Sequence, residues 1–149
     1  MMLTLEGRLS DSLLLTYRAP ARSMEGLAPE GLSLVTYGPW AFWNVIAARI
    51  ERLRPVGLPR IVGPSFHMVG YRLVVRAEVT GGQTVQGLYH VRTDADHLLV
   101  PPLGNALSDL RFHRARIALK RYGTELSLEV KDTRGFDGNC GSTPPRWRR

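Results

Sequence analysis

The pattern of hydrophobic and polar positions along this chain is mostly that of β-strands. Over residues 71–79, YRLVVRAEV, every second side chain is apolar, and Arg72 lies among the alternate, more polar positions. A period of two is typical of a strand that is buried on one face. Gly81 and Gly82 then favour a tight turn, because glycine reaches positive φ angles without steric cost. The following QGLYHVRT segment is expected to return as the antiparallel partner.

Other segments support the same class with less clarity. Residues 115–131, ARIALKRYGTELSLEVK, predict a second hairpin in which the apolar residues before Tyr122-Gly123 pair with those after it. Residues 41–54 fit both the spacing of a helix face and the alternation of a strand, and periodicity alone slightly favours a helix. We assign a strand there, following the resemblance described below. One short helix is expected around Leu103–Leu110.

Length and composition indicate one domain without a membrane span. With 149 residues and 44% hydrophobic content, the chain can build one core, which we assign to residues 1–133. Residues 134–149 have no periodicity and are expected to form a disordered basic tail. No apolar run approaches the roughly 18–20 residues of a membrane span. Glu6 and Asp11 interrupt any signal peptide, so the cytoplasm is the expected compartment. The single cysteine, Cys140, excludes an intramolecular disulfide and a zinc site built on cysteine pairs.

The net charge of +7 raises the question of nucleic-acid binding. The 20 basic residues are 18 arginines and two lysines, scattered along the chain without a known nucleic-acid motif. General surface charge is therefore the favoured interpretation, and nucleic acid is not an expected partner.

Four segments carry a resemblance to a known family. They are LAPEGLSLVTYGPWAFWNVIAARIERLRPVGLP, the strand with Arg72, GLYHVRTDADHLL and LRFHRARIAL, which together span roughly residues 12–131. This pattern resembles the acetoacetate decarboxylase-like superfamily, and within it an uncharacterised bacterial family of unknown function. The resemblance implies a mainly β (α+β) fold, namely a curved, mostly antiparallel β-cone around a small-molecule cavity, with one or two short helices. Relatives continue into further strands, so a shortened or truncated member is one interpretation of this chain.

The resemblance also bears on activity. The decarboxylases use a lysine as a Schiff-base nucleophile. The corresponding position here is Arg114, whose guanidinium stays protonated and cannot attack a carbonyl. Where the uncharacterised relatives tend to have Glu and Asn ahead of the strand arginine, this chain has Met68 and Gly70. We therefore expect no Schiff-base decarboxylation and no cofactor.

The candidate ligand-binding residues are Arg72 and Arg114, because a planar guanidinium suits bidentate binding of a carboxylate. The alternative for each is a solvent-facing strand residue, with Arg72 paired to Glu78. His90 and His113 are weaker candidates for a general acid and base near neutral pH.

The remaining polar residues are assigned ordinary roles. His67 and His97 are expected in exposed loops. Asp94 and Asp96 are interpreted as a turn, since aspartates hydrogen-bond their own backbone there, rather than as cation ligands. No metal site is expected.

The leading hypothesis is a small-molecule-binding protein for a small carboxylate or keto acid, with any chemistry carried out by a histidine. The alternative is a non-enzymatic interaction module that binds nucleic acid or an acidic partner through its basic surface. A third interpretation is a shortened domain without activity. A homo-oligomer is compatible with all three.

Overall fold

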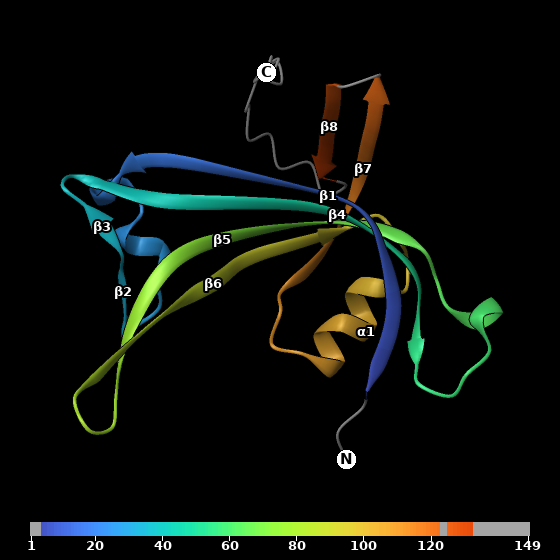
Figure 1. The fold of residues 1–149 in the computed structure, drawn as a ribbon, viewed down its shortest axis with the longest axis horizontal. Helices are drawn as coiled ribbons and strands as arrows, with labels where there is room; N and C mark the ends of the chain where they lie inside the picture. Colours follow the sequence, from blue (N-terminus) through green and yellow to red (C-terminus); the bar gives the residue numbers. More distant parts are fainter. Residues whose placement is uncertain (1–3, 123–124, 133–149) are drawn as a thin grey trace.

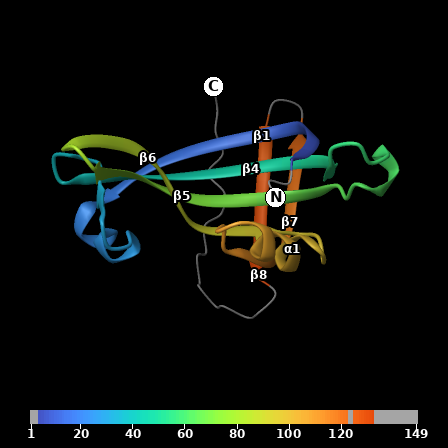
Figure 2. The same ribbon diagram turned by 90° about the horizontal axis from the view of Figure 1, so that it is seen from below.

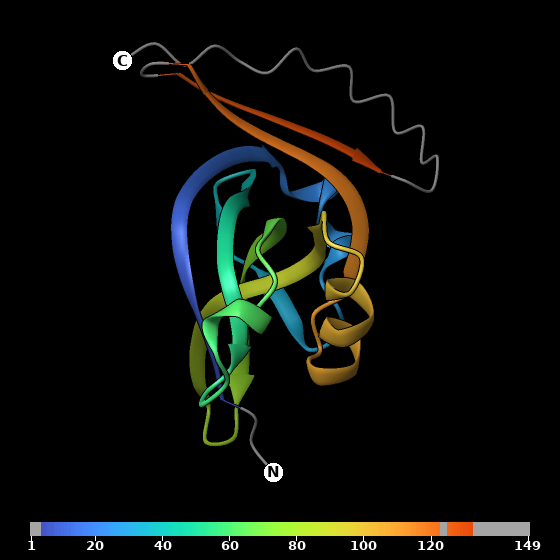
Figure 3. The same ribbon diagram turned by 90° about the vertical axis from the view of Figure 1, so that its right-hand side faces the viewer.

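The chain folds mainly as one curved β-sheet, described here from a computed structural model covering residues 4–122 and 125–132. The strand order is β1-β4-β5-β6-β7-β8, with β2 added to β5 and β3 added to β4. The sheet curls, as Figure 3 shows when viewed from its end. The expected fold class, a mainly β curved sheet with few helices, is confirmed.

The elements are β1 (Leu5–Pro20), two 3-10 turns (Ala21–Ser23, Glu25–Leu27), β2 (Leu32–Leu34), β3 (Thr36–Tyr37), β4 (Trp40–Pro55), a third 3-10 turn (Arg60–Val62), β5 (Phe66–Val79), β6 (Gln83–Ala95), α1 (Val100–Leu107), β7 (Phe112–Tyr122) and β8 (Glu125–Asp132).

The ambiguous segment at 41–54 is a strand, as assigned. It forms most of β4, which pairs with β1 along one edge and with β5 along the other. Ala47 and Ala48 are buried between these neighbours. Pairing on both edges satisfies the backbone of β4, so the tertiary context overrides the helix-like spacing of its apolar residues.

The β5–β6 hairpin is confirmed and is longer than its sequence pattern suggested, because β5 already begins at Phe66. Gly81 and Gly82 both have positive φ at the turn, as expected. The hairpin of β7 and β8 is also confirmed, with Ile117 opposite Val130. Ala115 lies opposite Asp132, so the apolar pairing does not reach the start of β7. The expected turn residue Gly123 and the tail at 134–149 lie outside the described residues.

One pair of strands is parallel. β7 runs parallel to the end of β6, from Phe112 opposite Thr93 to Arg114 opposite Ala95. A parallel pair needs a crossover connection, and this connection contains α1. The helix spans Val100–Leu107 rather than the expected Leu103–Leu110. The expected bounds were wrong because Pro101 and Pro102 lie in the first turn of the helix, where the missing N–H and fixed φ of proline are tolerated.

The two faces of the long strands have different covers. One face, here called the helix face, carries Ile50, Phe66 and Met68, which pack with Val100 of α1. The opposite face carries Ala41, Leu73 and Val75, which pack with Met24 and neighbouring apolar side chains. In Figure 1, α1 and the β7–β8 hairpin project from opposite sides of the sheet. Figure 2 shows that the hairpin runs across the direction of β1, β4 and β5.

Within the described parts of the chain, α1 is far too short to cross a bilayer and no other helix qualifies.

Candidate functional site

A row of polar residues crosses the helix face over four adjacent strands. Thr16 of β1 lies opposite Asn44 of β4, Asn44 lies opposite Arg72 of β5, and Arg72 lies opposite His90 of β6. Residues directly opposite one another in a sheet share a face. The Thr16 hydroxyl donates to Oδ1 of Asn44 at 2.7 Å. We call Thr16, Asn44, Arg72 and His90 the polar row.

Arg72 is the charged centre of this row. Its side chain is half-buried, and its Nε–H is fully shielded and has no hydrogen-bond acceptor among the described residues. The expected alternative, a solvent-facing arginine paired to Glu78, does not fit this arrangement, because Glu78 lies opposite Thr84 and is exposed. A shielded guanidinium donor without an acceptor is costly unless an anion supplies one.

His90 lies beside Arg72 because of an irregularity in the pairing of β5 with β6. β6 carries one extra residue at this point, a β-bulge that places Arg72 opposite His90 while Tyr71 lies opposite Arg92. A Cβ at position 70 would lie 3.7 Å from Cδ2 of His90, an ordinary van der Waals distance, and 3.2 Å from Cγ2 of Ile46, so it is Ile46 rather than His90 that a side chain there would crowd. Burial lowers the pKa of His90 below its ordinary value of 6.5, and the positive charge of Arg72 lowers it further.

Thr93 adds a second buried polar atom next to the row. It lies opposite Gly70 and is 0% exposed, and its Oγ1 has no hydrogen-bond partner within the described part of the protein. Thr16, Asn44 and Thr93 were not among the residues selected from the sequence. Thr16 and Asn44 do interrupt apolar strand segments, which is the local signal that can mark such positions.

The structure places Arg114 and His113 away from the polar row. Arg114 lies opposite Ala95, and His113 lies opposite Asp94, both near the end of β6. Ala95 follows His90 by about 16 Å of strand at ~3.3 Å per residue. Arg72 and Arg114 therefore occupy separate positions, and so do His90 and His113. Nδ1 of His113 is shielded and has no partner among the described residues.

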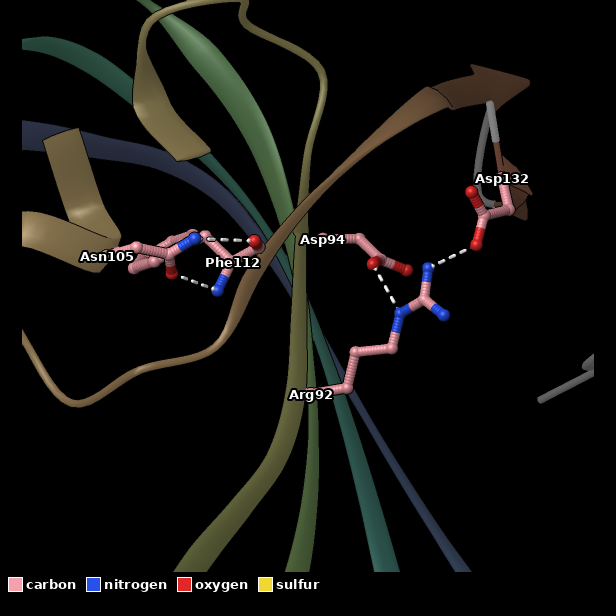
Figure 4. A network of polar contacts seen from close by, with 5 residues as sticks. All are labelled: Arg92, Asp94, Asn105, Phe112 and Asp132. Atoms are coloured by element: carbon pink, nitrogen blue, oxygen red, sulfur yellow. Dashed lines mark hydrogen bonds and ion pairs between the residues drawn. The ribbon is translucent and has the colours of Figure 1, made fainter. Parts of the chain in front are cut away.

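Asp94 belongs to an ion network rather than to a turn. It lies in β6, is 2% exposed and accepts from Nε of Arg92 at 2.6 Å. The same guanidinium donates through Nη2 to Asp132 at 2.7 Å, which ties the end of β8 to β6 (Figure 4). Burial, together with the negative charge of Asp94, raises the pKa of Tyr71 to about 12. The expected turn role of Asp94 was wrong because the strand extends through it.

A side-chain amide fixes the start of β7 against α1. Asn105 donates to the Phe112 carbonyl at 3.0 Å and accepts the Phe112 N–H at 2.7 Å (Figure 4). Phe112 also packs in the apolar cluster under the helix. These contacts set the position at which β7 leaves the sheet.

His67 was expected in an exposed loop, and this was wrong. It lies in β5 and is half-buried. Its backbone N–H donates to Oδ1 of Asp96 at 2.7 Å, and its Nδ1 lies 2.8 Å from Oδ2 of the same carboxylate. The pairing joins residues 29 positions apart, which no local pattern indicates. Across residues 4–122 and 125–132, no cluster of three or more His, Cys, Asp or Glu residues is arranged to hold a metal ion.

Comparison with known proteins places this sheet in a defined family. No curated protein matches the sequence. A family model described as an uncharacterized conserved protein, DUF2071, matches residues 6–147, which includes most of the segment assigned above to a tail. The match covers nearly the whole chain, and the protein therefore belongs to the DUF2071 family.

Proposed function

We propose that the protein binds a small carboxylate, of the simple or keto-acid type, at Arg72 on the helix face. The observation that carries this proposal is the Nε–H of Arg72, which has no acceptor among the described residues. Because this atom is shielded, binding requires the half-buried Arg72 side chain to turn toward the ligand. A carboxylate is the anion whose two oxygens match the guanidinium fork. Asn44 and His90 flank Arg72 on the neighbouring strands and offer further hydrogen bonds.

The lowered pKa of His90 favours a neutral imidazole beside the bound anion. A neutral imidazole can accept a proton, so any chemistry at this site would use His90 as the base. We also propose a distant relationship to the acetoacetate decarboxylase-like superfamily, with the lysine nucleophile replaced by Arg114. Because Arg114 lies away from Arg72 as well as lacking nucleophilicity, this proposal excludes a Schiff-base mechanism.

The test is isothermal titration calorimetry and thermal unfolding with acetate, pyruvate, lactate and acetoacetate. A ligand that binds only the native state raises the melting temperature. Binding that is lost in Arg72→Ala and kept in Arg76→Ala, an exposed arginine on the same strand, is the expected result. Absence of binding to wild type, or equal binding to both variants, contradicts the proposal.

Among the residues that the structure describes, no specific contact favours the alternative of a nucleic-acid-binding module. Several arginines that contribute to the positive charge are engaged within the protein: Arg54 with Glu6, Arg49 with Glu51, and Arg92 with two aspartates. Salt-sensitive binding to DNA or RNA would revive that alternative.

A further inference from the structure

β1 is an edge strand, and no strand within residues 4–122 and 125–132 pairs with its outer edge. It stands first in the order β1-β4-β5-β6-β7-β8, and β4 is its partner on the inner side. In Figure 2 it lies along one border of the group formed by β1, β4 and β5. The outer side of an edge strand presents a row of backbone N–H and C=O groups, which is a template for a further strand.

The middle of β1 lacks the features that commonly keep sheet edges apart, namely charges, prolines and bulges. A bulge between Leu9 and Asp11 interrupts the strand on one side, and Pro20 ends it on the other. Between them, residues 12–17 (SLLLTY) contain no charged residue, proline or glycine. β8, at the far end of the strand order, differs in this respect, since it carries Glu125, Glu129, Lys131 and Asp132.

This stretch of β1 also exposes its side chains. Leu14 is 59% exposed, and Ser12 and Thr16 on either side of it are exposed as well. These three alternate residues share the helix face with Asn44, which lies opposite Thr16. The opposite face of the same stretch carries Leu13, Leu15 and Tyr17.

Residues 12–17 are complementary to themselves when two copies run antiparallel with Leu14 opposite Leu14. Ser12 then lies opposite Thr16 of the second copy, and Leu13 lies opposite Leu15 of the second copy. Leucines meet leucines and hydroxyls meet hydroxyls, which are pairs that stabilise neighbouring strands. Opposite residues must share a face, so the nearest alternative registers place Leu14 opposite Ser12 or Thr16 and lose this match.

The charges at the two ends of the stretch favour the same direction. Asp11 precedes it and Arg18 follows it. A parallel pair in register would place each of these residues opposite its own copy, and like charges directly opposite one another are destabilising. An antiparallel pair instead brings the acidic end of one strand to the basic end of the other.

We propose that the protein forms a two-fold symmetric dimer in which residues 11–17 of two β1 strands pair antiparallel, centred on Leu14. The two sheets then form one continuous sheet, and the backbone groups of both edges become paired. Because each copy uses the same edge, the contact is closed and assembly stops at two copies. The dimer does not depend on the carboxylate binding proposed above.

Analytical ultracentrifugation of the full chain over a range of concentrations is the first test, and we expect a reversible dimer. Leu14→Lys would place two lysines directly opposite one another, so it should raise the dissociation constant at least tenfold. Leu103→Lys changes a leucine of similar exposure on α1, 55%, and should leave the constant unchanged. A monomer at every concentration, or a dimer that the two variants affect equally, overturns the proposal.

Disulfide cross-linking tests the register without a charged variant. Every variant carries Cys140→Ser, because Cys140 is the only cysteine of the chain. Leu14→Cys should form a covalent dimer on mild oxidation, since Cα atoms of opposite residues lie about 4.5–5.5 Å apart, within disulfide reach. Ser12→Cys alone should not, because its copy lies four residues away, or about 13 Å along the strand. A mixture of Ser12→Cys and Thr16→Cys should cross-link. Cross-linking of Ser12→Cys alone in preference to Leu14→Cys overturns the proposed pairing.

Discussion

Arg72 and His90 lie directly opposite one another across the β5–β6 pair, at the bulge of β6. The guanidinium opposes protonation of the imidazole, and burial opposes it more strongly. Arg72 thus has a neutral neighbour that can share an anion with it, rather than a second cation that repels it. Because the pKa of His90 is lowered in the folded protein, the stability of the protein should depend on pH through this residue.

Acid should destabilise the protein through His90. Its pKa is lowered in the folded state from an ordinary value of 6.5, so the unfolded chain binds a proton more readily. The stability that His90 contributes is therefore present above pH 6.5 and is lost as the pH falls through its folded pKa. Urea unfolding at a series of pH values should show a shallower acid decline in His90→Gln than in wild type.

The contribution of the Arg72 charge to the lowered pKa of His90 can be measured separately. In Arg72→Gln, the pKa of His90 should rise part of the way toward its ordinary value, because burial, the larger cause, remains. A proton NMR titration of the His90 ring measures this directly. An unchanged pKa would mean that the two side chains do not interact in solution.

The geometry of the guanidinium fork should matter for carboxylate binding as well as its charge. A hydrogen bond to a charged group is worth about 1.5–3 kcal/mol, or roughly tenfold to a hundredfold in affinity. Arg72→Lys keeps the charge and loses the fork, so we expect binding to weaken about tenfold, and Arg72→Ala to weaken it further. Calorimetry on both variants separates the effect of the two-pronged guanidinium geometry from the effect of the positive charge. Equal carboxylate affinities of wild type and Arg72→Lys would argue against a bidentate contact.

The ion network around Arg92 should be essential for stability. Arg92→Leu leaves Asp94, which is 2% exposed, without its charged donor. Because the Arg92 side chain is itself 31% exposed, we expect a loss of about 1–3 kcal/mol, less than for a fully buried pair. Asp132→Asn should cost less, since the side chain of Asp132 is more exposed at 18%. Urea unfolding checks the order of the two, and equal losses would contradict it.

Gly104 should resist substitution although it lies in a helix. A Cβ there would lie 2.5 Å from Cδ2 of Phe112, so in Gly104→Ala either the Phe112 ring or α1 must shift. We expect a loss of about 1–3 kcal/mol, despite the better helix propensity of alanine. Gly87→Ala is the control, because a Cβ at position 87 meets nothing within 4 Å. A stabilised Gly104→Ala variant would show that the contact yields easily.

The strands could be predicted where alternation is local, as at Leu73 and Val75, whose burial follows the pattern directly. The extent of α1 could not, because Pro101 and Pro102 are compatible with the first turn of a helix as well as with a loop before it. For residues 41–54, the hydrophobic pattern alone slightly favoured a helix. The pairing of β4 with both β1 and β5 cannot be recognised from a short stretch of sequence.

Arg72 could be selected from its residue type, but its neighbours could not. Thr16 and Asn44 join it only through strand order, which depends on pairing between distant segments. The His67–Asp96 contact and the bulge beside His90 are likewise products of register. Residue chemistry is local, whereas the assembly of a site is not.

The pairing of β1 has a consequence for how the protein is made. β1 leaves the ribosome before β4, and its partner positions range from Trp40, opposite Pro20, to Pro55, opposite Leu5. Until β4 has emerged, the leucines of β1 have no sheet to join. Long-range pairing of this kind is slow compared with closure of the β5–β6 hairpin. The nascent chain therefore exposes these leucines to solvent until β4 has emerged, which is a stage at which partly folded chains associate most easily.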